Sequence, residues 1–550
     1  MKSGTGITTW MKDQMKRIVL IAAGIVLILV AVHVFSAVRE DHTAASSSEP
    51  MDMAVGMNLS SVTYWTRGLP FVDIMKTAMP WVTQNAHNVL KGKNPWDTRV
   101  LDSIPLDTNG YPLSLPVEVE GTQAPQIVAT LLCRDIEGRY PAGKYVCLYE
   151  GEGQIEFHFD ARVASVSPGR IEIDVTPSSD GRGILMKIVR SQRENHIRNI
   201  RVIMPGFEEA SKTQPFNPIF VDGLRPFKVI RFMCWQRTND SCEKTWDQRT
   251  ARSSYTQAGD HGVAIEYMIE LCNLLGADPW FCIPHQADDE YIQSFASLVK
   301  NQLMPERKVY IEYSNEVWNS MFPQYRWVDE HGNPSWSHPE RYASFAGKAF
   351  GIWHRVFGDT KGRVIRVVSG QQANPGIIQG AIDKMGSDGM DAMATGAYFG
   401  LGKAGYEKLQ ILGEKAGASD VMRLVMDYMH AHEIPMLRKH ADIASEYNLQ
   451  YLAYEAGQSV CPSPLGTSPA YRRALWDVQK SPDMYLAYRE FMQACRDMNI
   501  SVFMAFSYVT AQETRYGSWG HLAYLGQPLS EAPKYRALID EINSGHPGRN

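Results

Sequence analysis

From about residue 222 onward, the sequence alternates between short apolar runs and longer segments whose apolar residues recur at helical spacing. A run of roughly four to eight apolar residues between turn signals is typical of a buried strand. With the earlier run 53–59, the alternation gives eight strand–helix units, which predict an α/β fold of the (β/α)8 TIM-barrel type. The expected strands are 53–59, 227–233, 280–285, 308–313, 364–368, 392–397, 450–454 and 501–506. The expected helices are 71–81, 263–275, 291–303, 340–357, much of 419–447, 484–498 and 534–542.

Residues 95–215 follow a different pattern of short segments, most of which alternate apolar and polar residues. Turn signals separate these segments, as in an antiparallel β-sandwich. We therefore expect an inserted β-sandwich domain after the first β/α unit of the barrel. The expected parts are a basic segment 1–17, a transmembrane anchor 18–38, a linker 39–52, the first β/α unit 53–94, the inserted domain 95–215 and the remaining barrel 216–545.

Residues 18–38 form an apolar run interrupted only by His33 and Ser36, long enough to span a bilayer as a helix. Lys12, Lys16 and Arg17 precede the run, so its N-terminal flank should stay cytoplasmic. This predicts a single-pass membrane protein whose larger part is periplasmic or extracellular. A cleaved signal peptide is the alternative, because 34–37 offers small residues near a possible cleavage point.

Composition and cysteine spacing narrow the possible partners. The net charge is −5 with both signs mixed along the chain, so no nucleic-acid-binding surface is expected. Cys133 with Cys147, and Cys234 with Cys242, are spaced so that each pair could form a local disulfide in an oxidising compartment. No cysteine or histidine cluster has metal-ligand spacing, so no zinc site is expected. No cofactor is implied either, because the two carboxylates described below suffice for the expected chemistry.

In a TIM barrel the chemistry lies at the C-terminal ends of the strands. Two carboxylates occupy such ends: Glu316 follows the fourth expected strand and Glu455 follows the seventh, on roughly opposite sides of the ring. The other candidate side chains at strand ends are Asn58, Arg231, His285, Asn315, Gln371, Gln372, Tyr398 and Tyr508.

The segment 308–319 combines three groups that sugar chemistry uses. Glu316 can protonate a glycosidic oxygen, the Asn315 amide can hydrogen-bond a hydroxyl, and the Trp318 indole can pack on a pyranose ring. Several of the candidate residues also have a purely structural interpretation. Arg231 could simply neutralise a buried carboxylate, His285 could be a packed core group, and Trp318, Trp65 and Trp519 could be core aromatics. Glu312 lies four residues before Glu316 and is expected to be structural and paired, whereas Tyr454 is expected to be a packing residue.

Ser314-Asn315-Glu316 on strand four and Tyr454-Glu455-Ala456-Gly457 on strand seven resemble the superfamily of retaining glycoside hydrolases that carry two catalytic glutamates on these strands. Cellulases, xylosidases, α-L-arabinofuranosidases and exopolysaccharide glycosidases belong to it. The run 266–280 is similar to the arabinofuranosidase-like branch, and the resemblance covers 53–92 and 220–545.

The resemblance implies that Glu316 is the general acid/base and Glu455 the nucleophile. It also implies that Asn315 binds the sugar 2-hydroxyl and that Tyr398 donates to the nucleophile. One departure is that Phe506-Ser507-Tyr508 stands where such barrels often carry a tryptophan platform.

The sequence therefore predicts a membrane-anchored hydrolase of a polysaccharide, acting beside polysaccharide synthesis or export machinery. A non-catalytic polysaccharide-binding scaffold and a transglycosylase using the same residues are the alternatives.

Overall fold

The computed structural model describes residues 53–86, 96–358, 362–461 and 469–544. The anchor 18–38 and the flanks 1–17 and 39–52 lie outside these residues, so their predicted roles stay predictions. Within the described ranges, no helix is both long enough and apolar enough to cross a bilayer.

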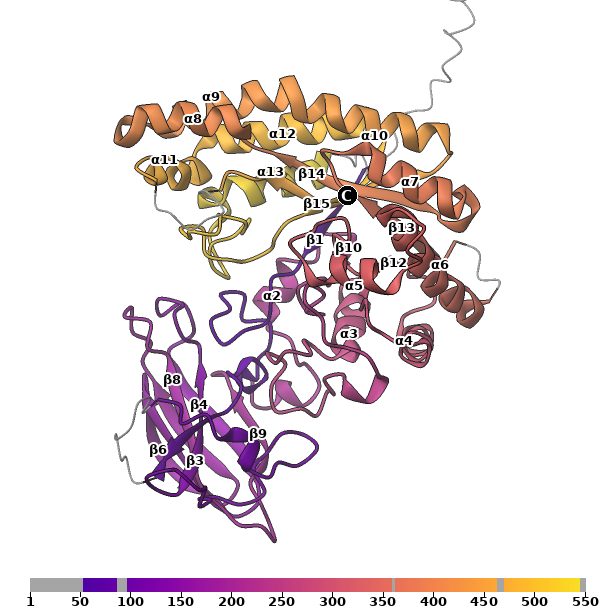
Figure 1. Cartoon of the computed structure of the whole chain (residues 1–550). Coiled ribbons are helices and arrows are strands. Elements are labelled where there is room, and N and C mark those ends of the chain that lie inside the picture. The colour runs from indigo at the N-terminus through magenta and orange to yellow at the C-terminus, as the bar shows by residue number, and fades with distance from the viewer. Residues whose placement is uncertain (1–52, 87–95, 359–361, 462–468, 545–550) are drawn as a thin grey trace, which may run out of the picture. The chain divides into compact units, whose positions relative to one another are not determined.

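Eight parallel strands close into a barrel in chain order, β1-β10-β11-β12-β13-β14-β15-β16 (Figure 1). Each strand predicted for the barrel is present, and this confirms the predicted α/β barrel. The strands are β1 Ala54–Asn58, β10 Val229–Arg231, β11 Asp278–Ile283, β12 Val309–Tyr313, β13 Val364–Gly370, β14 Ala392–Phe399, β15 Gln450–Gln458 and β16 Ile500–Ala505.

The helices follow their strands around the outside of the barrel (Figure 1). Their ends carry the expected local signals. Asp288 caps α4 by accepting from the Tyr291 N–H at 2.7 Å, and Gly276 ends α3 with a left-handed φ of 64°. The helices are α2 Pro218–Asp222, α3 Ile265–Leu275, α4 Asp289–Gln302, α5 Pro323–His331, α6 His338–Phe357, α7 Pro375–Met385, α8 Gly402–Leu412, α9 Ala418–Tyr428, α10 Ile434–Glu446, α11 Arg472–Asp477, α12 Pro482–Asp497 and α13 Pro533–Ser544.

Two four-stranded antiparallel sheets form the inserted domain, in the orders β2-β3-β8-β5 and β6-β7-β4-β9. Side chains from both sheets, such as Val128, Ile188, Ile173 and Val202, belong to one buried apolar cluster, which makes the domain a sandwich. The strands are β2 Val82–Asn85, β3 Gln126–Leu132, β4 Gly143–Glu150, β5 Gly153–Phe159, β6 Ala161–Ser167, β7 Arg170–Val175, β8 Ile184–Ser191 and β9 Arg198–Ile203.

The predicted boundary at 94/95 and the predicted helix 71–81 differ from the structure. Only a single 3-10 turn, Ile74–Thr77, forms there, and β2 pairs antiparallel with β3 of the sandwich. The apolar residues that suggested a helix, Ile74, Met75 and Trp81 among them, pack into the sandwich core instead. The chain thus leaves the barrel directly after β1 and returns through the short helix α2 before β10.

The sandwich contacts the loop between β10 and α3. The Trp81 ring stacks on Tyr255 with centroids 4.9 Å apart, and the Trp81 N–H donates to the Tyr255 hydroxyl at 3.0 Å. Lys76 Nζ donates to the Ser254 carbonyl at 2.8 Å. These contacts bury a lysine against backbone carbonyls, and burial lowers the pKa of Lys76.

The cysteine pairs considered from spacing are not bridged. Cys133, Cys147, Cys234 and Cys242 are separate thiols. Cys147 lies on β4 with its side chain in the sandwich core, and Cys133 is also buried, where burial raises its thiol pKa to about 12. Packing, rather than a covalent link, accounts for these two cysteines.

Two glycines provide a test of how tightly the barrel is packed. A Cβ at Gly56 on β1 would lie 2.8 Å from the Val229 carbonyl oxygen and 2.2 Å from Met504 Sδ, whereas one at Gly347 on α6 would meet only Met385 Cε at 3.6 Å. We expect Gly56→Ala to lower the free energy of unfolding by about 1–3 kcal/mol through overpacking. Gly347→Ala should raise it by roughly 0.5–1 kcal/mol, since alanine suits a helix interior better. Chemical denaturation measures both, and equal effects would contradict the close approach at β1.

Candidate active site

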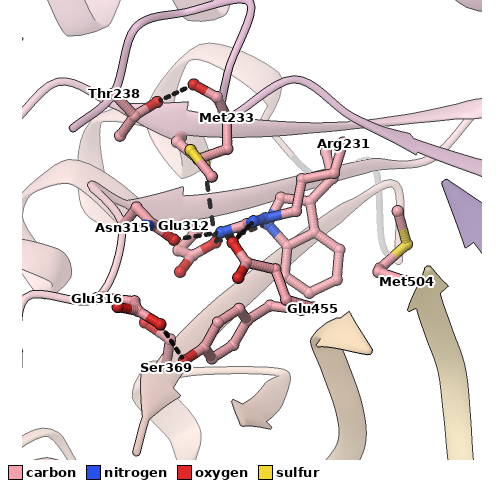
Figure 2. A network of polar contacts seen from close by, with 12 residues as sticks. Arg231, Met233, Thr238, Glu312, Asn315, Glu316, Ser369, Glu455 and Met504 are labelled. Carbon is pink, nitrogen blue, oxygen red and sulfur yellow. Dashed lines mark hydrogen bonds and ion pairs between the residues drawn. The ribbon is translucent and has the colours of Figure 1, made fainter. Parts of the chain in front are cut away.

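Arg231 is the last residue of β10 and its side chain is fully buried inside the barrel. Its guanidinium forms ion pairs with Glu312 at 2.8 Å and Glu455 at 3.1 Å. It also donates to Asn315 Oδ1 at 2.8 Å and to Asn58 Oδ1 at 3.1 Å. Figure 2 shows Glu312, Asn315 and Glu455 gathered around this guanidinium. Four side chains, from the end of β1, from within and just after β12, and from within β15, therefore meet at one charge.

Glu312 lies within β12 and is completely buried. Its Oε2 atom accepts from both Arg231 and the Trp280 indole N–H, the latter at 3.0 Å. The Arg231 guanidinium also lies 5.6 Å from the Trp280 ring centroid. Glu312 therefore has the structural, paired role expected for it, and it holds Arg231 in place.

Glu455 points into the same cluster from β15. Arg231 donates to one oxygen, and the Tyr398 hydroxyl of β14 donates to the other at 2.9 Å. Burial raises the pKa of Glu455, while the Arg231 charge and the Tyr398 donor oppose that rise. The pKa of Tyr398 is raised well above its ordinary value by burial and by the Glu455 charge, so the phenol keeps its proton and acts as a donor.

Glu316 has a different environment. It accepts from the Asn319 amide at 3.0 Å and from the Tyr454 hydroxyl at 3.3 Å, and it forms no ion pair with any described residue. Burial, and then the charge of nearby Glu455, raise the pKa of Glu316 to about 7. One carboxyl is thus protonated up to near-neutral pH, while the other is held against a cation.

The backbone around Glu316 is unusual. Ser314 has φ 58° and Glu316 has φ 42°, both in the left-handed region that residues with a side chain rarely adopt. Strain of this kind persists where neighbouring contacts fix the conformation, and it gathers at functional sites. Here Gln324 donates to the Asn315 carbonyl at 2.8 Å, and Asn315 Nδ2 donates to Asn239 at 3.1 Å.

A bulge in β15 brings Tyr454 and Glu455 to the inner side together. The register pairs Thr395 with Ala453 and then Gly396 with Glu455, so Tyr454 is an extra residue. In a regular strand these two neighbours would point to opposite faces. A bulge re-aims side chains, and here it lets Tyr454 reach Glu316 while Glu455 reaches Arg231.

Of the other predicted site residues, Asn58 and Trp318 lie in or next to the cluster around Arg231 and Glu316, whereas His285 and Tyr508 make their side-chain contacts elsewhere. Asn58 is buried within the cluster, where its Nδ2 donates to the Tyr454 and Met504 carbonyls, so it supports Arg231. Trp318 is partly buried two residues after Glu316. Among the described residues, the side chains of His285 and Tyr508 form no hydrogen bond with the side chains of this cluster, although the Tyr508 backbone N–H donates to the Asn58 carbonyl at 3.0 Å.

His285 and Tyr508 are both buried. The His285 ring packs edge-on against Trp327 at 5.7 Å, and burial lowers its pKa to about 4. The Tyr508 hydroxyl donates to the Phe220 carbonyl at 3.3 Å. These contacts fit packing roles, and the prediction that His285 and Tyr508 bind substrate stays a prediction.

Sequence reasoning missed two residues of the site, Tyr454 and Asn319, whereas it considered Trp519 as either a core aromatic or a sugar platform. Tyr454 was expected to pack only, and Asn319 was not singled out, yet both donate to Glu316. Trp519 is partly buried with its ring 5.8 Å from Tyr398 and 5.8 Å from Phe506. It supplies an aromatic side chain beside Tyr398, although no tryptophan directly follows β16. Of the two missed residues, only Asn319 could have been found from the sequence, because it lies three residues after Glu316.

Within the part of the chain that the structure describes, no group of three or more His, Cys, Asp or Glu side chains is arranged to hold a metal ion. The chemistry available at this site is that of two carboxyl groups with contrasting environments. Such a contrast assigns one group as an acid and the other as an anionic nucleophile or base.

No family model and no curated protein matches this sequence. Solved structures with a similar arrangement include a GH51 arabinofuranosidase from Xanthomonas axonopodis pv. citri (15% identity, TM-score 0.36), covering 54% of this chain and 61% of that chain. They also include a family 51 α-L-arabinofuranosidase from Bifidobacterium longum (12% identity, TM-score 0.37), covering 59% of this chain and 67% of that chain. A third is the CBM22-1–GH10 part of endo-1,4-β-D-xylanase 10B from Clostridium thermocellum (11% identity, TM-score 0.35), covering 88% and 97%.

These neighbours are glycoside hydrolases, the class that the sequence resembles. The aligned region spans 61% of the length of the Xanthomonas enzyme. Because all three TM-scores are below 0.5, we base the functional assignment on the geometry of the site.

The buried cluster predicts a large stability effect at Glu312. Glu312→Ala would leave the Trp280 N–H without its acceptor and Arg231 with only one carboxylate, so we expect the free energy of unfolding to fall by about 3–5 kcal/mol. Asp174→Ala, which removes an exposed partner of Lys144, should change it by less than about 1 kcal/mol. Urea denaturation of both variants measures this difference, and similar values for the two would show that Glu312 is not essential to the cluster.

Proposed function

We propose that this protein is a retaining glycoside hydrolase in which Glu316 is the general acid/base and Glu455 is the nucleophile. The observation that carries the proposal is the contrast between two carboxyl groups, that of Glu316 in the turn after β12 and that of Glu455 within β15. Glu316 has a pKa of about 7 and no cationic partner among the described residues, whereas Glu455 contacts Arg231 and Tyr398.

In the first step, a Glu455 oxygen attacks the anomeric carbon and the bond to the leaving oxygen breaks. Glu316 gives its proton to that oxygen, so the leaving sugar departs as a neutral alcohol. Glu316 is then ionised and removes a proton from water, which attacks the anomeric carbon and releases Glu455. Two displacements at the same carbon retain its configuration.

The neighbouring residues fit these roles. Arg231 and Tyr398 stabilise the Glu455 carboxylate before attack and again when it leaves. Asn315 uses one Nδ2 proton on Asn239, which leaves a second proton for a sugar hydroxyl. Trp519, beside Tyr398, offers an aromatic face to a sugar ring.

We further propose that the substrate is a polysaccharide outside the cytoplasm, with the enzyme held at the membrane by residues 18–38. The basis is the apolar run itself and the basic residues before it. Such a position would place the enzyme beside polysaccharide synthesis or export machinery.

The assignment predicts strong effects of two isosteric substitutions. In Glu316→Gln and Glu455→Gln, hydrolysis of the best substrate from a panel of aryl glycosides and polysaccharides should fall by roughly two to four orders of magnitude. Glu446→Gln, at an exposed position on α10, should stay near wild type. Proton NMR of the first-formed product should show the anomeric configuration of the substrate.

Inverted product would overturn the retaining mechanism. Binding of a glycan without turnover, equally tight in wild type and both variants, would favour a non-catalytic scaffold instead. Transfer of the sugar to an added acceptor in preference to water would identify a transglycosylase with the same residues.

The raised pKa of Glu316 predicts the alkaline limb of the pH–activity profile. The acid must carry its proton when a poor leaving group departs, so kcat/KM should fall as pH rises through about 7. A substrate with a highly activated aryl leaving group needs no proton, and Glu316→Gln should retain more activity on it than on an unactivated glycoside. A profile of the variant on that substrate that still falls through pH 7 would show that another group titrates there.

A further inference from the structure

The backbone N–H and carbonyl of Tyr398 form hydrogen bonds with a side chain, at an edge of β14 where a neighbouring strand would normally pair. The pairing of β13 with β14 ends at Gly370 and Thr395, whereas the pairing of β14 with β15 continues to Phe399. The Tyr398 peptide therefore has no β13 partner on that edge. Gln372, just beyond β13, fills this place: its Oε1 accepts from the Tyr398 N–H at 2.8 Å, and its Nε2 donates to the Tyr398 carbonyl at 2.8 Å.

Gln372 is itself fixed by two residues from the segment α9–α10. Its second Nε2 proton goes to Glu433 Oε2 at 2.6 Å, and its carbonyl accepts from His440 Nε2 at 2.9 Å. Glu433 is the last residue of a five-residue π-helical turn, Met429–Glu433, that joins the two helices. Such turns are uncommon and occur often at functional sites. Burial raises the pKa of Glu433 to about 7, which marks it as a desolvated carboxyl and not an ordinary surface acid.

The space around this arrangement is also closely fitted. A Cβ at Gly396 would lie 3.3 Å from Tyr398 Cδ2 and 3.4 Å from Gln372 Oε1, tighter than most such contacts. Gly396, which has no side chain, thus leaves room for the Gln372 amide. Together the contacts form one chain: Glu433 holds Gln372, Gln372 holds the Tyr398 peptide, and the Tyr398 hydroxyl donates to Glu455.

We propose that Glu433 and Gln372 are positioning residues that fix the Tyr398 hydroxyl on the nucleophile Glu455. The proposal rests on the function proposed above. Both residues act through Tyr398 and not by contact with the substrate. Without Glu433 the Gln372 amide can rotate away, and the Tyr398 peptide then loses its two side-chain hydrogen bonds. A misplacement of about 1 Å at a catalytic group can lower the rate up to a hundredfold.

A double-mutant cycle separates positioning from general support of the fold. Tyr398→Phe should lower kcat/KM roughly tenfold to a hundredfold, as expected for a hydrogen bond to a charged group. Glu433→Ala and Gln372→Ala should each lower kcat about tenfold with KM changed less than about twofold. In the Tyr398→Phe background, both substitutions should have almost no further effect, because the hydroxyl that they position is gone.

Two control variants complete the cycle. Glu433→Gln keeps an oxygen that can accept from Gln372, so it should recover most of the rate lost in Glu433→Ala. Glu446→Ala removes an exposed carboxylate from α10 and should match wild type. Effects of Glu433→Ala that simply multiply with those of Tyr398→Phe, or that equal those of Glu446→Ala, would overturn the proposal.

Crystal structures of wild type, Glu433→Ala and Gln372→Ala give a second readout that does not depend on activity. In both variants the Tyr398 hydroxyl should lie outside hydrogen-bond distance of Glu455, and a hydroxyl still in place would overturn the proposal. A wild-type enzyme that hydrolyses no glycoside would refute the proposed function, and these structures would still decide whether Glu433 and Gln372 position Tyr398.

Discussion

The site depends on a single buried positive charge. Arg231 has no exposure to solvent, and taking a guanidinium out of water is unfavourable by several kcal/mol unless anions and acceptors surround it. Glu312 forms an ion pair with it at 2.8 Å, while Asn58 and Asn315 accept from further guanidinium donors. Arg231 therefore has two carboxylate partners, Glu312 and Glu455, and Glu455 also accepts a hydrogen bond from Tyr398.

This division of charge separates the roles of the two carboxyl groups. Glu455 lies against the guanidinium and the Tyr398 hydroxyl, both of which favour its ionised form. Glu316 receives only neutral donors, and the negative charge of Glu455 makes its own ionisation harder. After Glu455 has formed a covalent bond to a sugar, that negative charge is gone, so the pKa of Glu316 should fall. A fall of this kind would suit the change from acid to base that the second displacement requires.

Two local irregularities of the backbone make this geometry possible. The left-handed conformations at Ser314 and Glu316 turn the chain sharply after β12, and the extra residue Tyr454 in β15 places two neighbouring side chains on the inner side. Both irregularities carry a conformational cost that regular strands avoid. Hydrogen bonds from side chains, such as those of Gln324 and Tyr454, offset this cost within the site itself.

The sequence by itself determined the barrel, its eight strands and the positions of Glu316 and Glu455 at strand ends, because apolar periodicity and turn residues are local properties of the chain. It also indicated Arg231, Asn315 and Tyr398, since strand ends are where a barrel displays polar groups. Only the tertiary structure decided that Ile74, Met75 and Trp81 pack into the sandwich core while Phe71 packs with the barrel, because 71–81 has an apolar pattern that fits either partner. The same holds for the β15 bulge, which places Glu455 and Tyr454 on the same side, and for Glu433, which is linked to Tyr398 through Gln372. Contacts between residues far apart in the chain depend on register and on distance in space, and neither can be read from local pattern.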